Sequence, residues 1–535
     1  MLKRNFPKAI KRRWENIHRL VASYLFNVKG FSIPPASRMI FTLTFALLAV
    51  VFYLVLKYIY SYWDRHGLPN LKPHIPFGNL KTVAMQTESI GMAINSIYWK
   101  TKGQLVGIYL FFRPAIMIRD AQLAHRIMTE DFNSFRDRGV YCDEEGDPFS
   151  AHLFALAGKQ WKHLRNKLTP TFTSGQLRNM LPTILGVGVK LQNHLRPAAA
   201  AGEVMEMRDM ISRFVLEIIA TVFFGFEANC IHDPNDSFRT VLGDTQRESL
   251  INSIRSAGTF ICPGLFKIPG IKSLDAKVIE LTTNIVTQQI ENRERSGVTR
   301  RDFIQQLIDL RQEDTKNGEV GLSVGTCAAN VFLFYVAGTE TTAGTISFTL
   351  YELCQQPDLM ARLQTEIDLA LKESMGGINY DVVARMRLLD LCVKETLRKY
   401  PGLPILNREC TQDYKVSDSE VVIKKGTQVI IPIHAYSADE KYFPDPDRYH
   451  PKRFDPETKS YDENAYAPFG EGPRNCIGIR MGVLVTKICL VMLLSKFNFA
   501  TLSESKLDFS TAVPGIRPKD GIRLKIETRH IESTA

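Results

Sequence analysis

The sequence has no Cys-x-x-Cys pair, although it contains nine cysteines. Nine is an odd number, and these residues are scattered singly from Cys142 to Cys489. The pattern argues against a disulfide framework and against a zinc site with paired cysteine ligands. We therefore expect the folded part of the chain to lie in a reducing compartment.

Linkers and internal repeats are also missing. Residues 64–535 contain no Ser/Gly tract, no block of like charge and no repeat. Hydrophobic residues make up 45% of the chain and charged residues 23%, which is typical of a globular protein with a large core. Although 535 residues would allow several domains, we expect one large domain behind an N-terminal segment.

Acidic residues are nearly absent from that N-terminal segment. Residues 1–38 hold nine Lys and Arg but one acid, Glu15, and so supply +8 of the net charge of +11. Because the rest of the chain carries only +3, its charge does not favour nucleic-acid binding.

Residues 39–60 form a long apolar run, which is long enough to cross a bilayer as a helix. The run exceeds the apolar region of a signal peptide, and no small-x-small cleavage site follows it. We therefore predict a retained membrane anchor over residues 39–63 and a proline-rich hinge over residues 64–80. An interfacial aromatic cluster is expected at the end of the anchor, made of Tyr58, Tyr60, Tyr62 and Trp63.

One cysteine is distinguished by its surroundings. Residues 468–482 read PFGEGPRNCIGIRMG, a glycine-rich loop that continues into an apolar run ending at residue 499, which we predict to be a buried helix. The three glycines around Cys476 would permit positive φ angles and close approach to a bulky flat partner. A helix N-terminus, together with Arg474 and Arg480, would favour the thiolate form of Cys476.

The longest helical pattern begins at Ser323, a plausible N-cap, and stops before Pro357. Its middle reads AGTETT, which places Glu340 and Thr341 within an apolar run. These threonine hydroxyls either bond back to the preceding helical turn or belong to a polar site. Elsewhere, residues 104–120 predict a short hairpin.

These segments together resemble the cytochrome P450 family of haem-thiolate monooxygenases, especially its insect microsomal members. The strongest match is to the haem-binding loop F-x-x-G-x-R-x-C-x-G, which this chain provides as Phe469, Gly472, Arg474, Cys476 and Gly478. The resemblance extends from about residue 39 to residue 527. It implies a mainly α fold with small β-sheets (α+β), with a single large catalytic domain over residues 81–535.

The resemblance also implies haem b as the cofactor, with Cys476 as the axial thiolate ligand of the iron. Phe469 would pack against the haem. Arg474 would pair with a propionate, as would Trp161 and Arg165, which lie at i and i+4 on one predicted helical face.

Two further motifs match the family. Thr341 and Glu340 fall in its (A/G)-G-x-(D/E)-T-(T/S) pattern, which implies catalytic roles: a hydrogen bond in the oxygen-binding pocket from Thr341, and a proton relay through Glu340. Glu395, Arg398 and Arg453 would form a buried structural triad.

The implied reaction inserts one atom of O2 into a lipophilic small molecule and reduces the other to water. Electrons from NADPH would arrive through NADPH-cytochrome P450 reductase, with cytochrome b5 as an optional second donor. The implied roles are metabolism of endogenous lipophiles or detoxification of xenobiotics and insecticides. A cationic docking patch is expected from Lys159, Lys162, Lys167, Lys394, Lys399 and Lys487.

Two rival functions share the fold: rearrangement of peroxides without a reductase, and haem binding without turnover. Both are disfavoured because the chain keeps Glu340 and Thr341. An apolar substrate pocket is expected from residues 137–156, 327–342, 403–408 and 511–517, which include Phe149, Phe154, Phe332, Phe334, Leu403 and Ile405.

The resemblance implies the endoplasmic reticulum membrane, with the catalytic domain on its cytoplasmic side. Residues 1–38 conflict with this orientation, because basic residues ahead of a span hold the N-terminus in the cytoplasm. We therefore expect the functional N-terminus near Met39, after which Lys57, Arg65 and Lys72 favour a cytoplasmic domain. The extension would then be either a mistaken upstream start or a mitochondrial presequence, the latter implying a mitochondrial location.

Overall fold

The computed structural model describes residues 35–247, 249–268, 270–317, 322–417, 419–502, 507–511 and 515–530. Most of the predicted basic extension lies outside these residues. The chain divides into two compact units, Met1–Ile59 and Tyr60–Ala535. The described part of the first unit belongs to helix α2 (Pro35–Tyr60), in which Thr42–Tyr60 has a mean hydropathy of 2.1 and is long and apolar enough to cross a membrane.

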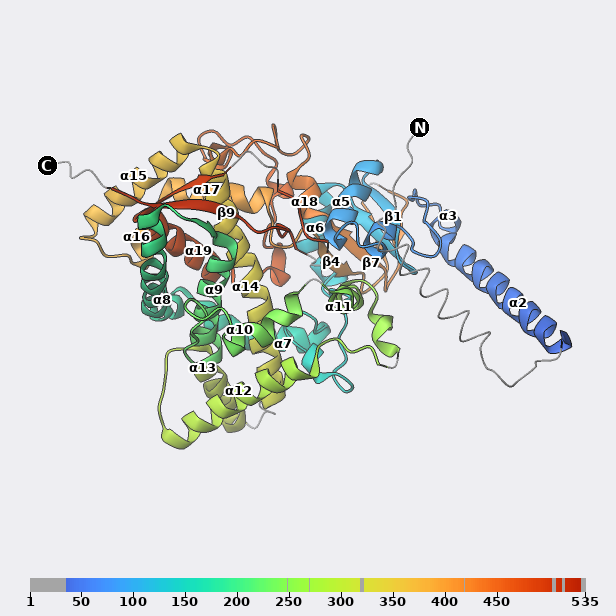
Figure 1. Ribbon diagram of the computed structural model, residues 1–535. Coiled ribbons are helices and arrows are strands. Elements are labelled where there is room, and N and C mark those ends of the chain that lie inside the picture. The colour runs from blue at the N-terminus through green and yellow to red at the C-terminus, as the bar shows by residue number, and fades with distance from the viewer. Residues whose placement is uncertain are drawn as a thin grey trace. The chain divides into compact units, whose positions relative to one another are not determined.

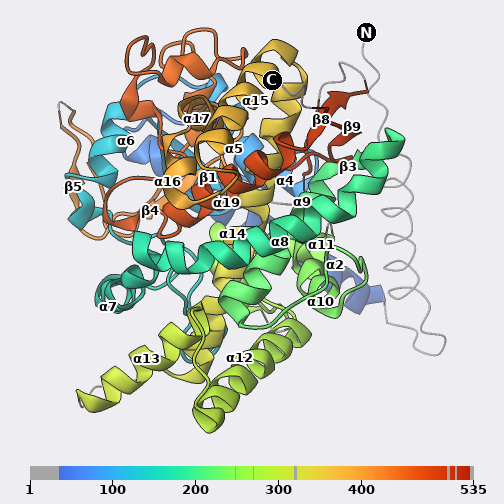
Figure 2. The same cartoon turned by 90° about the vertical axis from the view of Figure 1, so that its left-hand side faces the viewer.

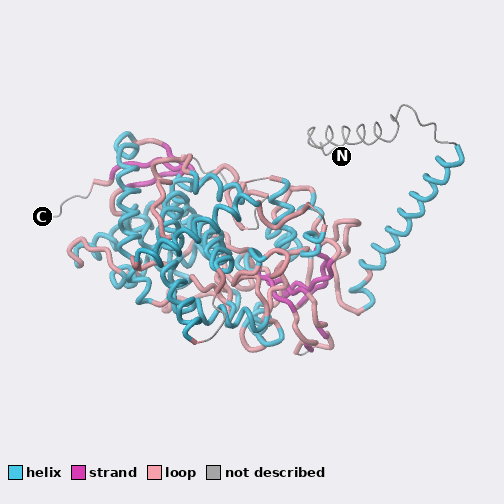
Figure 3. Tube along the Cα trace, turned by 90° about the horizontal axis from the view of Figure 1, so that it is seen from below, coloured by secondary structure: helices cyan, strands magenta, loops and turns pink. Residues whose placement is uncertain are grey.

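Helices make up most of the second unit (Figure 1 and Figure 3). In chain order they are α3 (Tyr62–Arg65), α4 (Lys81–Ala84), α5 (Ile90–Lys100), α6 (Ala121–Met128), α7 (Gly158–Leu168), α8 (Ser174–Ala201), α9 (Met207–Ile219), α10 (Ser237–Gly243), α11 (Leu250–Phe260), α12 (Ala276–Ser296), α13 (Phe303–Lys316), α14 (Val324–Cys354), α15 (Pro357–Glu373), α16 (Tyr380–Arg385), α17 (Arg387–Lys399), α18 (Ile433–Ser437) and α19 (Ile479–Leu494).

The strands of the second unit form three small sheets. They are β1 (Leu105–Leu110), β2 (Arg113–Ile118), β3 (Val204–Glu206), β4 (Leu406–Glu409), β5 (Tyr414–Lys415), β6 (Val422–Ile423), β7 (Gln428–Ile431), β8 (Phe497–Thr501) and β9 (Arg523–Thr528). The sheet orders are β1-β2-β7-β4, β3-β9-β8 and β5-β6, and only the β2–β7 pair is parallel among these described strands. The predicted fold class and the predicted hairpin, β1–β2, are both confirmed.

Helix α14 lies among the other helices of this unit (Figures 1 and 2) and packs against α9, α12, α17 and α19. It begins as predicted, because Ser323 Oγ accepts a hydrogen bond from the Thr326 N–H at 3.0 Å. Thr339 and Thr345 each donate a hydrogen bond to the carbonyl four residues earlier, at 2.7 and 2.8 Å. These back-bonds satisfy hydroxyls inside an apolar helix, which continues without a break across Gly338.

Two of the four aromatic residues expected at a membrane interface, Tyr60 and Trp63, are buried in the core instead. Tyr60 and Trp63 are 5% and 4% exposed, and the Trp63 indole donates a hydrogen bond to the Ile108 carbonyl of β1 at 2.9 Å. Gly107 makes room for this ring, since an added Cβ would lie 2.5 Å from it. Both rings therefore cover the outer edge of the first sheet, and the predicted interfacial cluster is wrong for them.

The apolar run after the cysteine loop is not one helix. Helix α19 ends at Leu494, and Phe497–Thr501 forms strand β8. In this strand Phe497 and Phe499 are buried while Asn498 and Ala500 are exposed, the two-residue alternation of a sheet with one covered face. The prediction extended the helix too far because a short apolar segment is compatible with either period.

The predicted triad is buried and fully connected. Arg398 donates two hydrogen bonds to the Glu395 carboxylate, both at 2.9 Å, and Arg453 Nε lies 3.1 Å from each Glu395 oxygen. The three residues are 0–2% exposed. Spare guanidinium N–H groups donate to the carbonyls of Ser437 and Pro444, at 2.7 and 2.8 Å. The triad therefore ties α17 to the loops that precede the cysteine.

Replacing Arg398 by Leu should prevent recovery of folded, haem-containing protein. The change leaves Glu395 in the interior with one partner fewer, which costs about 3–5 kcal/mol of the free energy of unfolding. The yield of soluble protein and its haem content measure the effect. Arg178→Leu is the matched control, because its ion pair with Asp381 is exposed and should contribute little. Normal yield of the Arg398→Leu protein would contradict a structural role for the triad.

Candidate active site around Cys476

Cys476 lies in a tight loop between a short 3₁₀ turn, Gly472–Arg474, and the start of α19. Its backbone N–H donates a hydrogen bond to the Phe469 carbonyl at 2.9 Å, which closes the loop. Gly470 and Gly472 have φ angles of 68° and 67°, and a Cβ at Gly472 would overlap the Met128 carbonyl. The predicted need for glycine therefore holds at these two positions, whereas Gly478 adopts an ordinary negative φ of −92°.

The thiol of Cys476 faces a space inside the protein. Its side chain has exposed surface, yet burial raises the pKa of the Cys476 thiol. The Gly478 N–H and the guanidinium groups of Arg165 and Arg138 act in the opposite direction without overcoming burial. The predicted preference for thiolate is therefore wrong for the protein without haem. The charges that favour thiolate come from Arg165 and Arg138, whereas Arg474 and Arg480 were the residues predicted.

A second wall with exposed interior surface is formed by α14. Val336 is 39% exposed and Ala337 is also exposed, although this stretch of the helix is otherwise mostly buried. The two walls are adjacent, because a Cβ added at Gly482 of α19 would lie 3.9 Å from Thr342 Oγ1. The Thr341 hydroxyl donates a hydrogen bond to the Ala337 carbonyl at 2.6 Å, so its lone pairs are what it can offer to a neighbouring group.

Three guanidinium groups gather near the cysteine loop: those of Arg408 and Arg474, which are buried, and that of Arg138, which is half-buried. Burial, together with the positive charge of a neighbouring arginine, lowers the pKa of Arg408 and of Arg474 to about 9. The carboxylate nearest to Arg474 is that of Asp137, at 3.5 Å. Among the described residues no partner is found for Nε of any of the three, nor for Nη2 of Arg408. The cluster is therefore short of negative charge and of acceptors, as expected of a site for an anionic group.

The predicted pair on α7 supports this region in two different ways. Arg165 donates hydrogen bonds to the carbonyl and the side-chain oxygen of Asn475, both at 2.9 Å, and so fixes the residue before Cys476. Trp161 is buried, and its ring lies 4.3 Å from the Arg474 guanidinium. Trp161, Arg165, Phe469, Arg474 and Cys476 are thus brought together around one loop.

Neither Arg138 nor Arg408 was predicted as a site residue, although both fall within ranges predicted to line the substrate pocket. Arg408 lies in β4 and is 0% exposed, so a charged residue within the apolar stretch LPILNREC was the available signal. Arg138 donates a hydrogen bond to the Arg474 carbonyl at 3.1 Å and stacks on Phe154. No motif indicated it, because its partners lie far along the chain.

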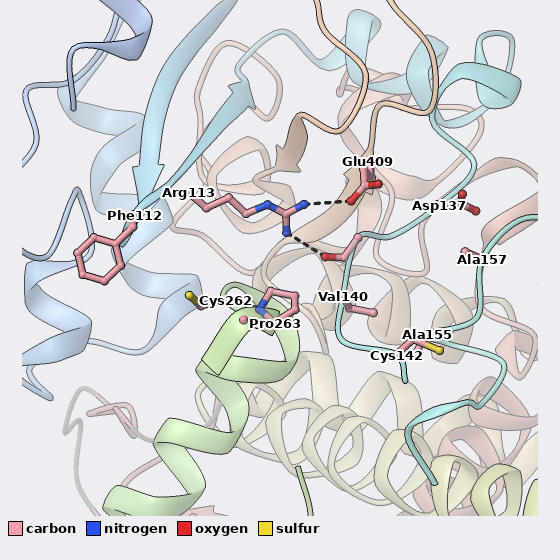
Figure 4. A pocket seen from close by; sticks show the side chains of 12 residues that line it. Phe112, Arg113, Asp137, Val140, Cys142, Ala155, Ala157, Cys262, Pro263 and Glu409 are labelled. Atoms are coloured by element: carbon pink, nitrogen blue, oxygen red, sulfur yellow. Dashed lines mark hydrogen bonds and ion pairs between the residues drawn. The ribbon is translucent and has the colours of Figure 1, made fainter. Parts of the chain in front are cut away.

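A cavity of about 620 Å³ lies beside this cluster (Figure 4). It is lined by Phe112, Arg113, Asp137, Gly139, Val140, Cys142, Ala155, Ala157, Cys262, Pro263, Gly264 and Glu409. Arg113 crosses it, with an ion pair to Glu409 at 3.0 Å and a hydrogen bond to the Gly139 carbonyl at 3.1 Å. Asp137 lines the cavity and also contacts Arg474, so the cavity adjoins the arginine cluster.

The predicted substrate-lining residues divide into two groups. Phe154, Leu403 and Ile405 line a small cavity of about 20 Å³ together with Arg138. Phe149 and Phe332 instead pack on each other, with ring centroids 5.5 Å apart. Phe334 is enclosed by three other phenylalanine rings, at 5.0–5.3 Å, namely Phe172, Phe223 and Phe303. These last residues belong to the core because helical spacing alone does not distinguish a core face from a pocket face.

The predicted cationic patch is also smaller than expected. Four of its six lysines are ion-paired: Lys167 with Asp314, Lys394 and Lys487 with Asp390, and Lys399 with Glu352. The Lys487 side chain is only 7% exposed. Lys159 and Lys162 remain exposed on α7.

A cysteine facing an interior space, a neighbouring helix with exposed surface, and arginines with unpartnered N–H groups fit a protein that holds a haem through a thiolate. The model of the family described as "Cytochrome P450" matches residues 68–525, and the chain belongs to this family. It is a monooxygenase with a haem-thiolate cofactor, and its family uses redox partners and lipophilic substrates.

Insect proteins are among the curated relatives. The chain is 41% identical to "Probable cytochrome P450 6d4" of Drosophila melanogaster, over 89% of this chain and 96% of that protein. It is 41% identical to "Cytochrome P450 6d3" of Musca domestica, over 92% and 99%. Identity to "Cytochrome P450 6a2" of Drosophila melanogaster is 37%, over 91% and 99%. The predicted resemblance to insect members is therefore confirmed.

The unpartnered arginine nitrogens fit the two carboxylates of haem. Arg408→Met should therefore raise the stability of the haem-free protein and weaken the retention of haem. Without haem, the variant should be more stable than the parent by about 1–4 kcal/mol, because it removes a buried charge with no carboxylate facing it. With haem, it should lose the cofactor faster. Thermal unfolding of the haem-free protein and haem transfer to a scavenger protein measure the two effects.

Arg126→Met is the control, because Arg126 is half-buried and bound to Asp131 and Ser417, away from the cluster. It should leave haem transfer unchanged. A haem-free Arg408→Met protein less stable than the parent would mean that the protein itself satisfies this arginine.

Proposed function

We propose that this monooxygenase inserts one atom of O2 into a lipophilic small molecule and reduces the other to water. The observation that carries this proposal is Cys476, held in the family's loop pattern with its thiol open to an interior space beside α14. In this proposal Cys476 would supply the thiolate that binds the haem iron. A metal would deprotonate the coordinating thiol, which overrides the effect of burial on its pKa.

The remaining site residues hold the cofactor and supply protons. Haem supplies oxygen activation when bound. Arg138, Arg408 and Arg474 would bind its carboxylates, and Trp161 and Arg165 would fix Arg474 and the cysteine loop. Phe469 would pack against the ring. Thr341 would accept a hydrogen bond in the space beside Ala337 while it donates to the Ala337 carbonyl, and Glu340 would move protons toward it. This accounts for two polar residues that an apolar helix would otherwise not favour.

Electrons would come from NADPH through NADPH-cytochrome P450 reductase, with cytochrome b5 as an optional second donor. Complementary charge favours docking of an acidic protein on α7, where Lys159 and Lys162 are exposed. Lys167, Lys394, Lys399 and Lys487 contribute less than their number suggests, because they already have carboxylate partners.

The substrate class is an apolar small molecule, either an endogenous lipophile or a xenobiotic such as an insecticide. Support comes from the apolar side chains beside the arginine cluster, such as Phe154, Phe260 and Leu403. Rearrangement of peroxides and haem binding without turnover are less consistent with this chain, since neither needs the Glu340–Thr341 pair.

Cys476→Ser should abolish the red-shifted Soret band of the reduced, CO-bound protein, because serine cannot supply a soft anionic donor. Absorbance spectra of the reduced protein with and without CO measure the band. Cys142→Ser is the control, since Cys142 is half-buried, lines the cavity beside the arginine cluster and lies outside the cysteine loop, and this variant should keep the band. A Cys476→Ser protein with the band intact would overturn the ligand assignment.

We place the protein in the endoplasmic reticulum membrane, with the catalytic domain on the cytoplasmic side and α2 as its anchor. The apolar stretch Thr42–Tyr60 and the basic residues after it support this orientation. The scattered cysteines suit a reducing compartment. The domain limits 1–38, 39–63, 64–80 and 81–535 belong to the same proposal, and a mitochondrial location is its alternative.

A C-terminal tag should be digested when protease is added to sealed microsomes, because the tag would lie outside the vesicles. Immunoblotting of the tag, together with that of a lumenal marker, measures its accessibility. The marker must stay intact until detergent is added. A protected tag would reverse the proposed orientation, and a tag found in mitochondria would favour the alternative location.

A further inference from the structure

The carboxylate of Glu340 is held from two directions. One oxygen forms a short ion pair with Nη2 of Arg208, which lies in the first turn of α9, and the other lies 4.0 Å from Nη1 of Arg517. The Arg208 side chain is 7% exposed, and Glu340 is its ion-pair partner among the described residues. A carboxylate on the central helix is therefore fixed by two cations from other parts of the chain.

The parts of the chain that carry Arg208 and Arg517 are hydrogen-bonded to each other. Glu206 caps α9 by accepting hydrogen bonds from the N–H groups of Arg208 and Asp209, at 3.0 and 2.7 Å. The same carboxylate accepts a hydrogen bond from Ile522 N–H at 2.7 Å, and β3 pairs with β9 beside it. The start of α9 is thus fastened to the C-terminal segment that also carries Arg517.

The C-terminal segment also reaches Thr341 through an intervening residue, Gly402. A Cβ added at Gly402 would lie 2.9 Å from Thr341 Cγ2, so the Gly402 backbone rests directly on this threonine. A Cβ added at Gly515 would in turn lie 3.1 Å from the Gly402 carbonyl oxygen. Glu340 is therefore contacted by Arg208 and Arg517, and Thr341 by the Gly402 backbone, which in turn contacts the segment that carries Arg517.

Successive residues of an α-helix point about 100° apart, so the side chains of Glu340 and Thr341 leave α14 in different directions. The position of the Glu340 carboxylate is then decided by what binds it rather than by the helix. Arg208 is the closer of its two cations, and a guanidinium holds a carboxylate in a defined geometry.

We infer that Arg208, supported by Arg517, is a positioning residue for proton delivery. It sets where the Glu340 carboxylate lies and so how protons reach the space beside Thr341. This inference rests on the proposed function, because it takes Glu340 and Thr341 to supply protons.

The test compares Arg208→Met with Arg208→Lys in the full-length, haem-containing protein, supplied with reductase and a substrate. Arg208→Met should lower the product formed per NADPH by about tenfold, less than the hundredfold or more expected for losing a proton-transfer group itself. Hydrogen peroxide should rise correspondingly. Arg208→Lys should recover part of the loss because it keeps the charge. Arg213→Met is the matched control, since Arg213 lies on the same helix but is paired with Asp209.

A second readout does not depend on turnover. In a double-mutant cycle of Arg208→Met and Glu340→Gln, followed by thermal unfolding of the haem-free proteins, the double variant should lose less than the sum of the single losses. Arg517→Met, at a partly exposed position, tests the same idea if Arg208→Met does not fold, and it should lower coupling in the same direction.

Additive losses of stability, or normal coupling in both Arg208→Met and Arg517→Met, would overturn the inference. Glu340→Gln and Thr341→Ala separate this failure from failure of the proposed function. If those two variants remain coupled, the proton-delivery role itself is wrong. If they uncouple while the arginine variants do not, only the positioning role is wrong.

Discussion

Burial of positive charge is the constraint on which the rest of this structure depends. A guanidinium group that is buried away from water needs hydrogen-bond acceptors. The arginines of the second unit find these acceptors in two ways. Arg398 and Arg453 find theirs within the protein, in Glu395 and backbone carbonyls. Arg138, Arg408 and Arg474 do so only in part, and in the proposed function the carboxylates of haem supply the remaining acceptors. The first pair holds parts of the scaffold together, and the three arginines near Cys476 are the group to which we assign cofactor binding.

Helix α14 connects these two sets with the chemistry. It packs against α9, α12, α17 and α19, while Val336 and Ala337 have exposed surface near Thr341. Hydroxyl groups along the helix are satisfied by carbonyls of the preceding turn, so polar residues do not interrupt it. The helix can therefore be rigid and still present polar atoms to the space near Cys476.

Features that depend on neighbours in sequence could be predicted well. The Ser323 cap, the β1–β2 hairpin and the glycine-rich turn before Cys476 each follow from a few adjacent residues. Features that depend on distant partners could not. Arg408 meets Arg474 only after folding, the Trp63 ring is buried because Gly107 accommodates it, and Lys487 is neutralised by Asp390 from another helix. Composition indicated none of these pairings.

The attachment of residues 60–80 to the first sheet bears on how the catalytic unit can be made soluble. Gly107 N–H donates a hydrogen bond to the Pro69 carbonyl at 2.8 Å, Leu71 N–H donates one to Gly107, and the Trp63 ring covers the same strand. A shortened protein that starts after residue 80 would therefore expose the edge of β1, and exposed strand edges promote aggregation. Removing the anchor just before Tyr60 keeps that edge covered, which makes Tyr60 the natural first residue of a soluble form.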